Sequence, residues 1–323
     1  MNRVLILTHE EDPHSASVRK YFDQNGIDYF EVLTDRLIGN YDLIFDLSKG
    51  SFTLSDSERQ IELGGDWSIW NRRVMDPDIP RSLQGRLDDI ILTETERTWQ
   101  GLLFTHPGRV VNRQQANFNA NNKVDQLLFA SRYGRGIKVP QTILTNDPEA
   151  FRKFYAGLPR VSFKLLKAPM VQTEGKNGYL TCYNNIVTDE QAERAELIRN
   201  NPSLFQEYVE KDYELRITAL EHKVVGIKID SQSSDLSLVD FRRYDFEKVS
   251  YEHVAVPKNV EDFCLDMLRH YGLFFGEFDF IRTKKGDYVF LEINPNGQWL
   301  WLELKSGYDL TKDVAENLLE RQS

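Results

Sequence analysis

Cysteine is scarce in this sequence: of its 323 residues, only Cys182 and Cys264 carry a thiol. Two cysteines cannot form a disulfide framework or a cysteine-rich zinc site. Long hydrophobic runs are also missing, because the apolar stretch at residues 4–7 ends at His9 and no stretch approaches the roughly 18 apolar residues of a membrane span. We therefore expect no signal peptide, no membrane partner and a cytoplasmic location.

Positive charge is outnumbered as well. Forty Lys and Arg residues face fifty Asp and Glu residues, which gives a formal net charge of −10. This balance argues against a protein whose main task is to coat nucleic acid or an anionic membrane, so we expect no nucleic-acid partner. The 41% hydrophobic and 28% charged residues are ordinary for a folded globular chain and too apolar for a disordered one.

Two common nucleotide-binding motifs do not occur. No Gly-x-Gly-x-x-Gly follows the first predicted strand, and the chain has no Gly-x-x-x-x-Gly-Lys-Ser/Thr. The dinucleotide fingerprint and the phosphate-binding P-loop are therefore excluded as routes to a nucleotide.

The first third of the chain alternates short apolar runs with helical patterns. The spacing predicts helices at 15–24, ended by Gly26, and at 88–103. Such alternation is typical of a small α/β domain, which we place at residues 1–113. The predicted strands of this domain lie at 4–7, 27–33, 43–47, 52–54 and 67–70.

The remaining chain divides into two further predicted domains. Residues 114–203 begin with a helical pattern over 114–133 and contain a polar loop at 167–178 with two glycines. Residues 204–323 are mostly strands, with helices predicted at 260–271 and 310–321. The whole chain is accordingly predicted to be of the mixed α/β (α+β) class.

Alternating residues near the C-terminus predict a β-hairpin with chemistry on one face. A two-residue turn at Lys285-Gly286 would place Asp279 opposite Glu292 and Glu277 opposite Asn294. Facing carboxylates repel unless a cation lies between them, and oxygen ligands of this kind suit Mg²⁺. The alternative interpretation is a solvated polar face without a metal.

The other face of this hairpin is predicted to be apolar. The same turn places Phe278 opposite Ile293 and Phe280 opposite Leu291. An apolar back face, together with the break at 295–297, favours a hairpin that is buried on one side and functional on the other.

Cationic residues that could accompany a phosphate-bound metal occur upstream. Lys164 lies in an apolar strand, where a charge is costly unless it meets an anion. Arg216 alternates with Glu214, and Arg242 and Arg243 follow Asp240; arginine suits an anion that gains charge in a transition state. A snorkelling edge lysine and surface ion pairs are the alternative interpretations.

Taken in order, these segments resemble the ATP-grasp superfamily. Any single segment is unspecific, whereas the series in this order and spacing across residues 122–294 is specific. The segments are Asn122-Lys123-Val124-Asp125-Gln126-Leu127-Leu128, Ile137-Lys138-Val139-Pro140-Gln141-Thr142, Lys164, Gln206-Glu207-Tyr208-Val209, Glu214-Leu215-Arg216, Asp240-Phe241-Arg242, Asp279 and Glu292-Ile293-Asn294.

The C-terminal ending narrows the resemblance. Residues 290–299, Phe-Leu-Glu-Ile-Asn-Pro-Asn-Gly-Gln-Trp, are similar to those of the graspetide synthetases, ATP-grasp ligases that macrocyclise ribosomally made precursor peptides, as in microviridin biosynthesis. The Gly-Gln-Trp part discriminates them from general amino-acid ligases of the superfamily. Residues 1–113 match the family's pre-ATP-grasp domain more by length and element order than by motif.

The resemblance implies a role for each candidate residue. It assigns Mg²⁺ to Asp279, Glu292 and Asn294, and the lid over the phosphates to residues 167–178. It makes Arg216 and Arg242 the catalytic residues, which would contact the transferring phosphoryl group and the acyl phosphate. The ATP contacts that it implies are Lys123, Lys164, Gln206, Glu207, Tyr208, Val209, Glu214 and Arg242.

The resemblance also implies the reaction and the partners. ATP would phosphorylate a Glu or Asp side chain of a precursor peptide, and a Thr or Ser hydroxyl or a Lys amine would displace phosphate to close an ester or amide ring. It implies a homodimer and recognition of a leader segment, for which the hairpin at 217–229 is our candidate surface. Two alternatives stay open: a ligase that acts on a small molecule or a protein C-terminus, and a nucleotide-binding module without turnover.

Overall fold

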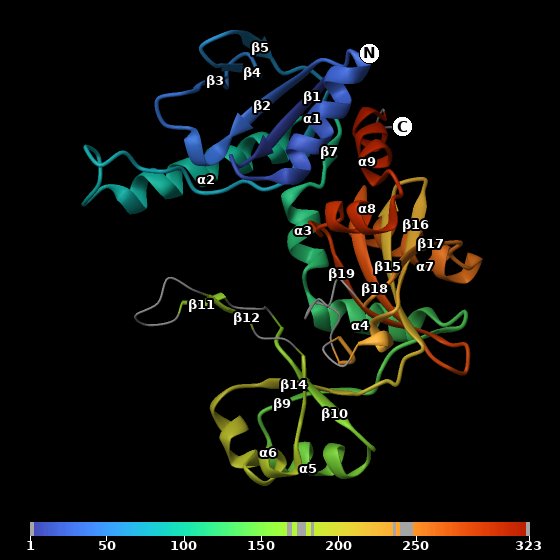
Figure 1. Cartoon of the computed structure of the whole chain (residues 1–323). Helices are drawn as coiled ribbons and strands as arrows, with labels where there is room; N and C mark the ends of the chain where they lie inside the picture. Colours follow the sequence, from blue (N-terminus) through green and yellow to red (C-terminus); the bar gives the residue numbers. More distant parts are fainter. Residues whose placement is uncertain are drawn as a thin grey trace.

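The computed structural model describes residues 3–166, 170–172, 179–181, 184–234, 237–239 and 248–320. Figure 1 shows three groups of elements, coloured along the chain: a blue N-terminal unit, a green-yellow central unit around β9, β10 and β14, and an orange-red unit built on β15 to β19. Within the described ranges, no helix has both the length and the apolar character needed to cross a bilayer.

A parallel sheet in the order β2-β1-β6-β7 forms the base of the N-terminal unit. Strand β1 is almost fully buried, as expected of a parallel strand covered on both faces. Asp12 caps helix α1, and Gly26 ends it with φ +65°, the left-handed conformation that suits glycine. The bounds are β1 Arg3–Thr8, α1 Pro13–Asn25, β2 Tyr29–Leu33, β6 Trp67–Asn71, α2 Asp88–Thr105 and β7 Val110–Val111.

The predicted third strand does not join this parallel sheet. It pairs in antiparallel fashion with the following strand to form a separate sheet in the order β3-β4-β5, which follows the short helix η1 Thr34–Arg36 in the chain. None of its residues is fully buried, so it could not fill an inner position of a covered sheet. The bounds are β3 Asp42–Asp46, β4 Ser51–Ser55 and β5 Gln60–Glu62.

The helix predicted over 114–133 is in fact two helices, α3 Gln114–Ala120 and α4 Lys123–Tyr133. The break lies at Asn122, whose side chain accepts hydrogen bonds from the backbone N–H groups of Val124 and Asp125. Asparagine is a strong N-cap, so it starts a new helix rather than continuing the old one. As a result, Lys123 occupies the first turn of α4.

The central unit has its own sheet, in the order β13-β10-β14-β9. Helix α5 covers this sheet, and Phe151, Val161 and Phe205 form a core separate from those of the other units. The segment before β14 forms a short helix α6 followed by the 3-10 helix η2. The bounds are β9 Thr142–Thr145, α5 Pro148–Ala156, β10 Val161–Lys164, β11 Met170–Gln172, β12 Tyr179–Thr181, β13 Asn185–Ile186, α6 Asp189–Glu193, η2 Ala195–Asn200 and β14 Ser203–Glu207.

The C-terminal unit is a sheet in the order β17-β16-β15-β18-β19-β8, antiparallel except for the last pair. Helix α7 packs on one face, while α8 and α9 pack on the other and contact the N-terminal unit. Elements β17 and α8 escaped sequence prediction. The bounds are β8 Ile137–Lys138, β15 Tyr213–Leu220, β16 Val224–Ile229, η3 Ser231–Ser233, β17 Tyr251–Val254, α7 Lys258–Tyr271, β18 Phe275–Arg282, β19 Tyr288–Asn294, α8 Leu300–Ser306 and α9 Leu310–Leu319.

The β15–β16 hairpin, our candidate leader-docking surface, lies inside this sheet. Ile217 and Ala219 are buried against α7, and Ile227 and Ile229 are buried on the opposite face. Both faces are covered, so the expectation that this hairpin offers a docking face is wrong.

Candidate active site

The β18–β19 hairpin has the predicted pairing where the chemistry lies. Asp279 is the direct partner of Glu292, and Glu277 is the partner of Asn294. The predicted two-residue turn is wrong, because the Thr283 N–H donates to the carbonyl of Asp287 and leaves a three-residue loop between them.

A β-bulge corrects the register between the loop and the acids. Phe280 pairs with Phe290, not with Leu291 as predicted, so Leu291 is the extra residue of β19. Its side chain consequently lines the pocket beside Asp279 instead of joining the apolar back face. The bulge thus adds an apolar wall to the acidic side of the hairpin.

Arg216 connects the acids of β18 from the neighbouring strand. It is the partner of Asp279 across β15 and β18, and its Nη1 donates to Asp279 Oδ1 at 2.7 Å while its Nε donates to Glu277 Oε2 at 2.9 Å. Thr218 Oγ1 donates to the other oxygen of Glu277 at 2.6 Å. One guanidinium therefore fixes the orientation of two carboxylates.

Burial and the neighbouring charges shift the pKa values of Glu277 and Arg216. Burial raises the pKa of Glu277 to about 7, against the opposing influence of Arg216 and Thr218. Although burial acts to lower it, the pKa of Arg216 is raised by the charges of Asp279 and Glu277. Arg216 therefore stays cationic, and Glu277 titrates near neutral pH.

Gly297 lies directly against this group. A Cβ atom at Gly297 would come within 2.3 Å of Glu277 Cγ and 3.1 Å of Arg216 Nη2. Only glycine permits such a close backbone approach, which explains why the chain has a glycine at this point of the Gly-Gln-Trp ending.

Lys123 approaches the second acid from α4. Its Nζ lies 2.7 Å from Glu292 Oε2 and also donates to the backbone carbonyl of Leu165 at 3.3 Å. Both side chains of this ion pair are about one quarter exposed, at 26% and 27%. This pair can therefore part more readily than the buried contacts of Arg216.

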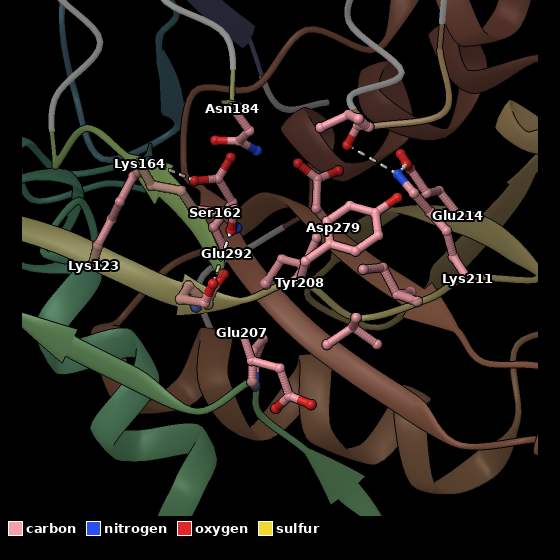
Figure 2. A pocket seen from close by; sticks show the side chains of 16 residues that line it. Lys123, Ser162, Lys164, Asn184, Glu207, Tyr208, Lys211, Glu214, Asp279 and Glu292 are labelled. Atoms are coloured by element: carbon pink, nitrogen blue, oxygen red, sulfur yellow. Dashed lines mark hydrogen bonds and ion pairs between the residues drawn. The ribbon is translucent and has the colours of Figure 1, made fainter. Parts of the chain in front are cut away.

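A pocket lies between this acidic face and the central unit (Figure 2). Nine of the twelve residues predicted from the sequence line it, contributed by α4, β10, β14, β15, β18, β19 and the segment after β14. These nine are Lys123, Lys164, Gln206, Glu207, Tyr208, Val209, Glu214, Asp279 and Glu292.

The segment at the end of β14 is fixed by backbone and side-chain contacts. The Glu207 N–H donates to Gln141 O at 2.8 Å, and Glu207 Oε2 accepts the Gln141 N–H at 3.2 Å. The ring of Tyr208 lies under the guanidinium of Arg160, 4.1 Å from its centroid. Gln206 is buried, and its amide donates to Thr142 Oγ1 at 2.9 Å.

Glu214 lines the pocket and is held by a residue that sequence reasoning missed. Buried Lys211 donates to Glu214 Oε1 and, at 3.2 Å, to the carbonyl of Val239. Ser231 Oγ also donates to Glu214 Oε1 at 3.3 Å. The signal for Lys211 was its position three residues before a strand glutamate.

Three predicted residues do not line this pocket. Arg216 lies behind Asp279, and Asn294 lies in the neighbouring cleft, where its Oδ1 accepts the Asn296 N–H at 3.0 Å. Arg242 lies outside the described residues, as do Arg243, Lys167 and most of the predicted lid. Of the predicted lid, the structure describes the strand β11, which pairs with β12 just beyond the lid.

Four further residues of the pocket wall escaped prediction because long-range contacts bring them in. Ser162 and Asn184 come from the central unit, Pro140 from the segment before β9, and Val239 from the segment after η3. No local pattern in the sequence marks them.

The donor set at the acidic end fits a hard divalent cation. Asp279 and Glu292 face each other across two strands, Asn294 follows two residues later, and all three offer oxygen atoms. In the structure, Arg216 and Lys123 neutralise the two carboxylates.

A second acidic cluster lies on the surface. Glu221, His222 and Glu320 place their ligand atoms within 4.8 Å of one another. Arg109 forms ion pairs with both carboxylates, so a cation already occupies this position. We assign no metal to it.

Family models match nearly the whole chain. The MvdD pre-ATP grasp domain matches residues 3–117, and the RimK-like ATP-grasp domain matches residues 120–318. The chain belongs to the RimK-like ATP-grasp family, and it is an ATP-grasp ligase with an N-terminal pre-ATP-grasp domain. ATP-grasp enzymes use ATP and Mg²⁺. The predicted fold class and enzyme class are confirmed.

Solved structures extend the likeness over the full length. The chain is similar to a RiPP-associated ATP-grasp ligase of Chryseobacterium gregarium, solved with ADP and a leader and core peptide, with 27% identity, 98% and 96% coverage of the two chains and a TM-score of 0.88. It is also similar to macrocyclase MdnC of Microcystis aeruginosa MRC, bound with precursor peptide MdnA, with 25% identity, 98% and 99% coverage and a TM-score of 0.84.

A third solved structure, macrocyclase MdnB of the same organism, shares 27% identity over 99% of both chains with a TM-score of 0.77. A comparison with curated proteins finds no match. The predicted resemblance to the peptide-macrocyclising ATP-grasp ligases is confirmed.

Proposed function

We propose that this protein is an ATP-dependent macrocyclase of a ribosomally made precursor peptide. The observation that carries the proposal is the convergence of Asp279, Glu292 and Lys123 at one end of a pocket whose other end is formed by Glu207 and Tyr208. The precursor and core peptides bound by similar ligases support this class of substrate.

ATP would lie along this pocket with its phosphates at the acidic end. Asp279, Glu292 and Asn294 would hold Mg²⁺, which screens the negative charge of the phosphate oxygens when it is bound. Lys164, on β10, and Lys123 lie beside these acids and supply further positive charge to the phosphates.

The adenine would lie between the segment 206–209 and the apolar wall of Ile281 and Leu291, with Glu214 toward the ribose. Arg216 is already bound to two carboxylates, so we propose that Arg216 acts by holding Asp279 in position. Arg242 keeps its predicted role at the phosphoryl group and the acyl phosphate.

The reaction takes two balanced steps. A side-chain carboxylate oxygen of the peptide attacks the γ-phosphorus of ATP, the bond to the bridging oxygen breaks, and ADP leaves. A Thr or Ser hydroxyl or a Lys amine then attacks the acyl carbon and loses its proton, and phosphate leaves with the former carboxylate oxygen. A carboxylate cannot react with a hydroxyl unaided, because oxide would be the leaving group.

The pocket has to open before the nucleotide enters. It encloses about 60 Å³, whereas pockets for small ligands usually measure about 300–1,000 Å³. The Lys123–Glu292 ion pair, whose side chains are about one quarter exposed, belongs to its wall and must part. The separate core of the central unit supports a movement of that unit away from the acids.

We further propose the domain boundaries 1–113, 114–203 and 204–323, a homodimer, and a cytoplasmic location. The oligomeric state is checked by light scattering during size-exclusion chromatography. A ligase that acts on a small molecule or a protein C-terminus would use the same pocket, so the product distinguishes it from a macrocyclase.

The test is co-expression with a candidate precursor, taken from any short open reading frame beside the gene, followed by mass measurement of the encoded peptide. We expect the mass to fall by one water molecule for each ring, with one ADP released per ring. An unmodified peptide, together with ATP-dependent ligation of a free amino acid, would instead support the alternative.

A further inference from the structure

The segment that follows the acidic strand β19 is held by side chains of the pre-ATP-grasp domain. Asn112 Nδ2 donates to the carbonyl of Pro295 at 2.9 Å. Arg72 Nη1 donates to the next two carbonyls, of Asn296 at 3.1 Å and of Gly297 at 3.2 Å. Consecutive carbonyls directly after Asn294 are thus bound from another domain.

His14 continues this attachment on the donor side of the segment. Its Nε2 accepts the backbone N–H groups of Trp299 at 3.2 Å and Leu300 at 3.3 Å, and its ring packs edge-on against Trp299, with centroids 5.1 Å apart. This bonding requires an unprotonated Nε2, which assigns the ring proton to Nδ1, 3.1 Å from Asp12 Oδ1.

Asp12 joins the two anchors. Its Oδ2 lies 3.3 Å from Arg72 Nε and accepts a hydrogen bond from Thr8 Oγ1 at 2.9 Å. Although burial alone would raise it, the pKa of Asp12 is held below its usual range by His14 and Arg72. Asp12 therefore stays anionic and orients both neighbours.

Arg72 is a buried cation, and its contacts across the interface do not use all of its hydrogen-bond donors. Only 2% of it is exposed, and its Nη2 has no hydrogen-bond partner among the residues that the structure describes. An unmatched buried guanidinium nitrogen is destabilising, and in native proteins such a group calls for a specific reason.

That reason lies in what Arg72 holds in place. Gly297 packs so closely on Glu277 and Arg216 that an added Cβ would come within 2.3 Å of the glutamate. A shift of this segment would therefore move the Arg216–Glu277 pair and, through Arg216 Nη1, the carboxylate of Asp279.

We propose that Arg72, with Asp12 and His14, is a positioning residue for ligation: the pre-ATP-grasp domain sets the place of the segment 295–300, and this segment sets the place of Arg216 and Asp279. The inference rests on the proposed function, because it assigns Asp279 to the reaction centre. The N-terminal domain then influences the reaction by positioning, although none of its residues contacts the reacting atoms.

The test compares Arg72→Met with Arg72→Lys in steady-state ligation assays, with the full-length chain as enzyme and the unmodified precursor peptide as substrate. We expect Arg72→Met to lower kcat about 30- to 100-fold while the KM for ATP stays within about threefold, because a displacement near the reacting groups costs about that much. Arg72→Lys, which can still donate to one carbonyl, should recover part of kcat.

Arg109→Met is the matched control. Arg109 is equally buried at 2% and also joins the N-terminal domain to the C-terminal unit, but it contacts Glu221 and Asn317 and not the segment 295–300. We expect it to lower the melting temperature and leave kcat within about twofold of the parent.

The outcomes separate this inference from the proposed function. An active parent enzyme whose kcat is unchanged by Arg72→Met, or lowered equally by Arg109→Met, overturns the positioning role alone. A parent enzyme that binds ADP but closes no ring overturns both. If Arg72→Met does not fold, Arg72→Lys decides: a kcat equal to that of the parent contradicts the inference.

Discussion

The two walls of the pocket are built in different ways. The wall of β15, β18 and β19 carries Asp279 and is fixed from behind by Arg216, which binds Asp279 and Glu277. Glu277 and Thr218, which also donates to Glu277, are almost completely buried. The wall of β10 and β14 belongs to the central unit, which has its own small core and connects through residues 139–141 and 208–212.

The difference in construction suits the two walls to different tasks, catalysis at the acidic wall and nucleotide entry at the opposite wall. The acidic wall needs a fixed geometry, because phosphoryl transfer depends on positioning and charge. The opposite wall needs to move, because a pocket of about 60 Å³ does not admit a nucleotide. Substitutions in the first wall should therefore change turnover and stability, whereas substitutions in the second should change mainly nucleotide affinity.

The largest effect is expected for the two facing acids. Asp279→Asn and Glu292→Gln keep the side-chain shape and remove the charge, so ADP release with precursor should fall about 1,000-fold while the far-UV circular dichroism stays native. The matched control is Asp287→Asn beside the loop of the same hairpin, where Asp287 pairs with Lys138 at 2.8 Å. Near-normal ligation by either acid variant would refute the metal assignment.

Arg216→Met should come next and should affect stability as well as turnover. It leaves Glu277 and Asp279 buried without their cation, a change that typically costs about 3–5 kcal/mol. Urea unfolding monitored by tryptophan fluorescence measures the loss. An unchanged unfolding midpoint would mean that the acidic wall does not depend on this guanidinium.

Lys164→Met tests the second wall. Because Lys164 lies on β10 in the pocket, we expect the KM for ATP to rise about 10- to 100-fold with little change in stability. Lys153→Met, an exposed lysine on α5 of the same unit, serves as the control. A lower kcat at saturating ATP with an unchanged KM would assign Lys164 to chemistry rather than binding.

Glu277 predicts a pH dependence of the acidic wall. Burial raises its pKa from 4.5 to about 7, so between these values the folded protein retains a proton that the unfolded chain has lost. The free energy of unfolding should therefore decrease by about 1 kcal/mol or more as the pH rises through this interval. Glu277→Gln should remove this decrease, and a parallel pH profile for both proteins would contradict the burial argument.

The smallest effect is expected for Glu207→Gln. This carboxylate accepts one backbone N–H, from Gln141, and an amide oxygen can do the same. Fluorescence titration with a nucleotide analogue should show an affinity within about twofold of the parent. A loss of tenfold or more would show that the charge itself contacts the nucleotide.

Sequence reasoning found the acids because their pattern is local. Alternation along two neighbouring strands placed Asp279 opposite Glu292, and the structure has this pair. The pairing survived a wrong turn because the loop is one residue longer than predicted and the bulge at Leu291 restores the register.

Other parts of the site depend on contacts between distant segments. Arg72 donates to the carbonyl of Gly297, which lies 225 positions further along the chain, and no local sequence pattern predicts this contact. Similarly, the break at Asn122 was hidden by a continuous helical pattern, although its capping side chain gives Lys123 its place beside Glu292.

The most direct test of the central claim follows one oxygen atom. With the precursor labelled by ¹⁸O in its Glu and Asp side chains, ligation through an acyl phosphate transfers one labelled oxygen to phosphate for every ring closed, and this transfer disappears in Asp279→Asn. Rings that close while the released phosphate contains no label from the peptide would contradict carboxylate activation by ATP at this site.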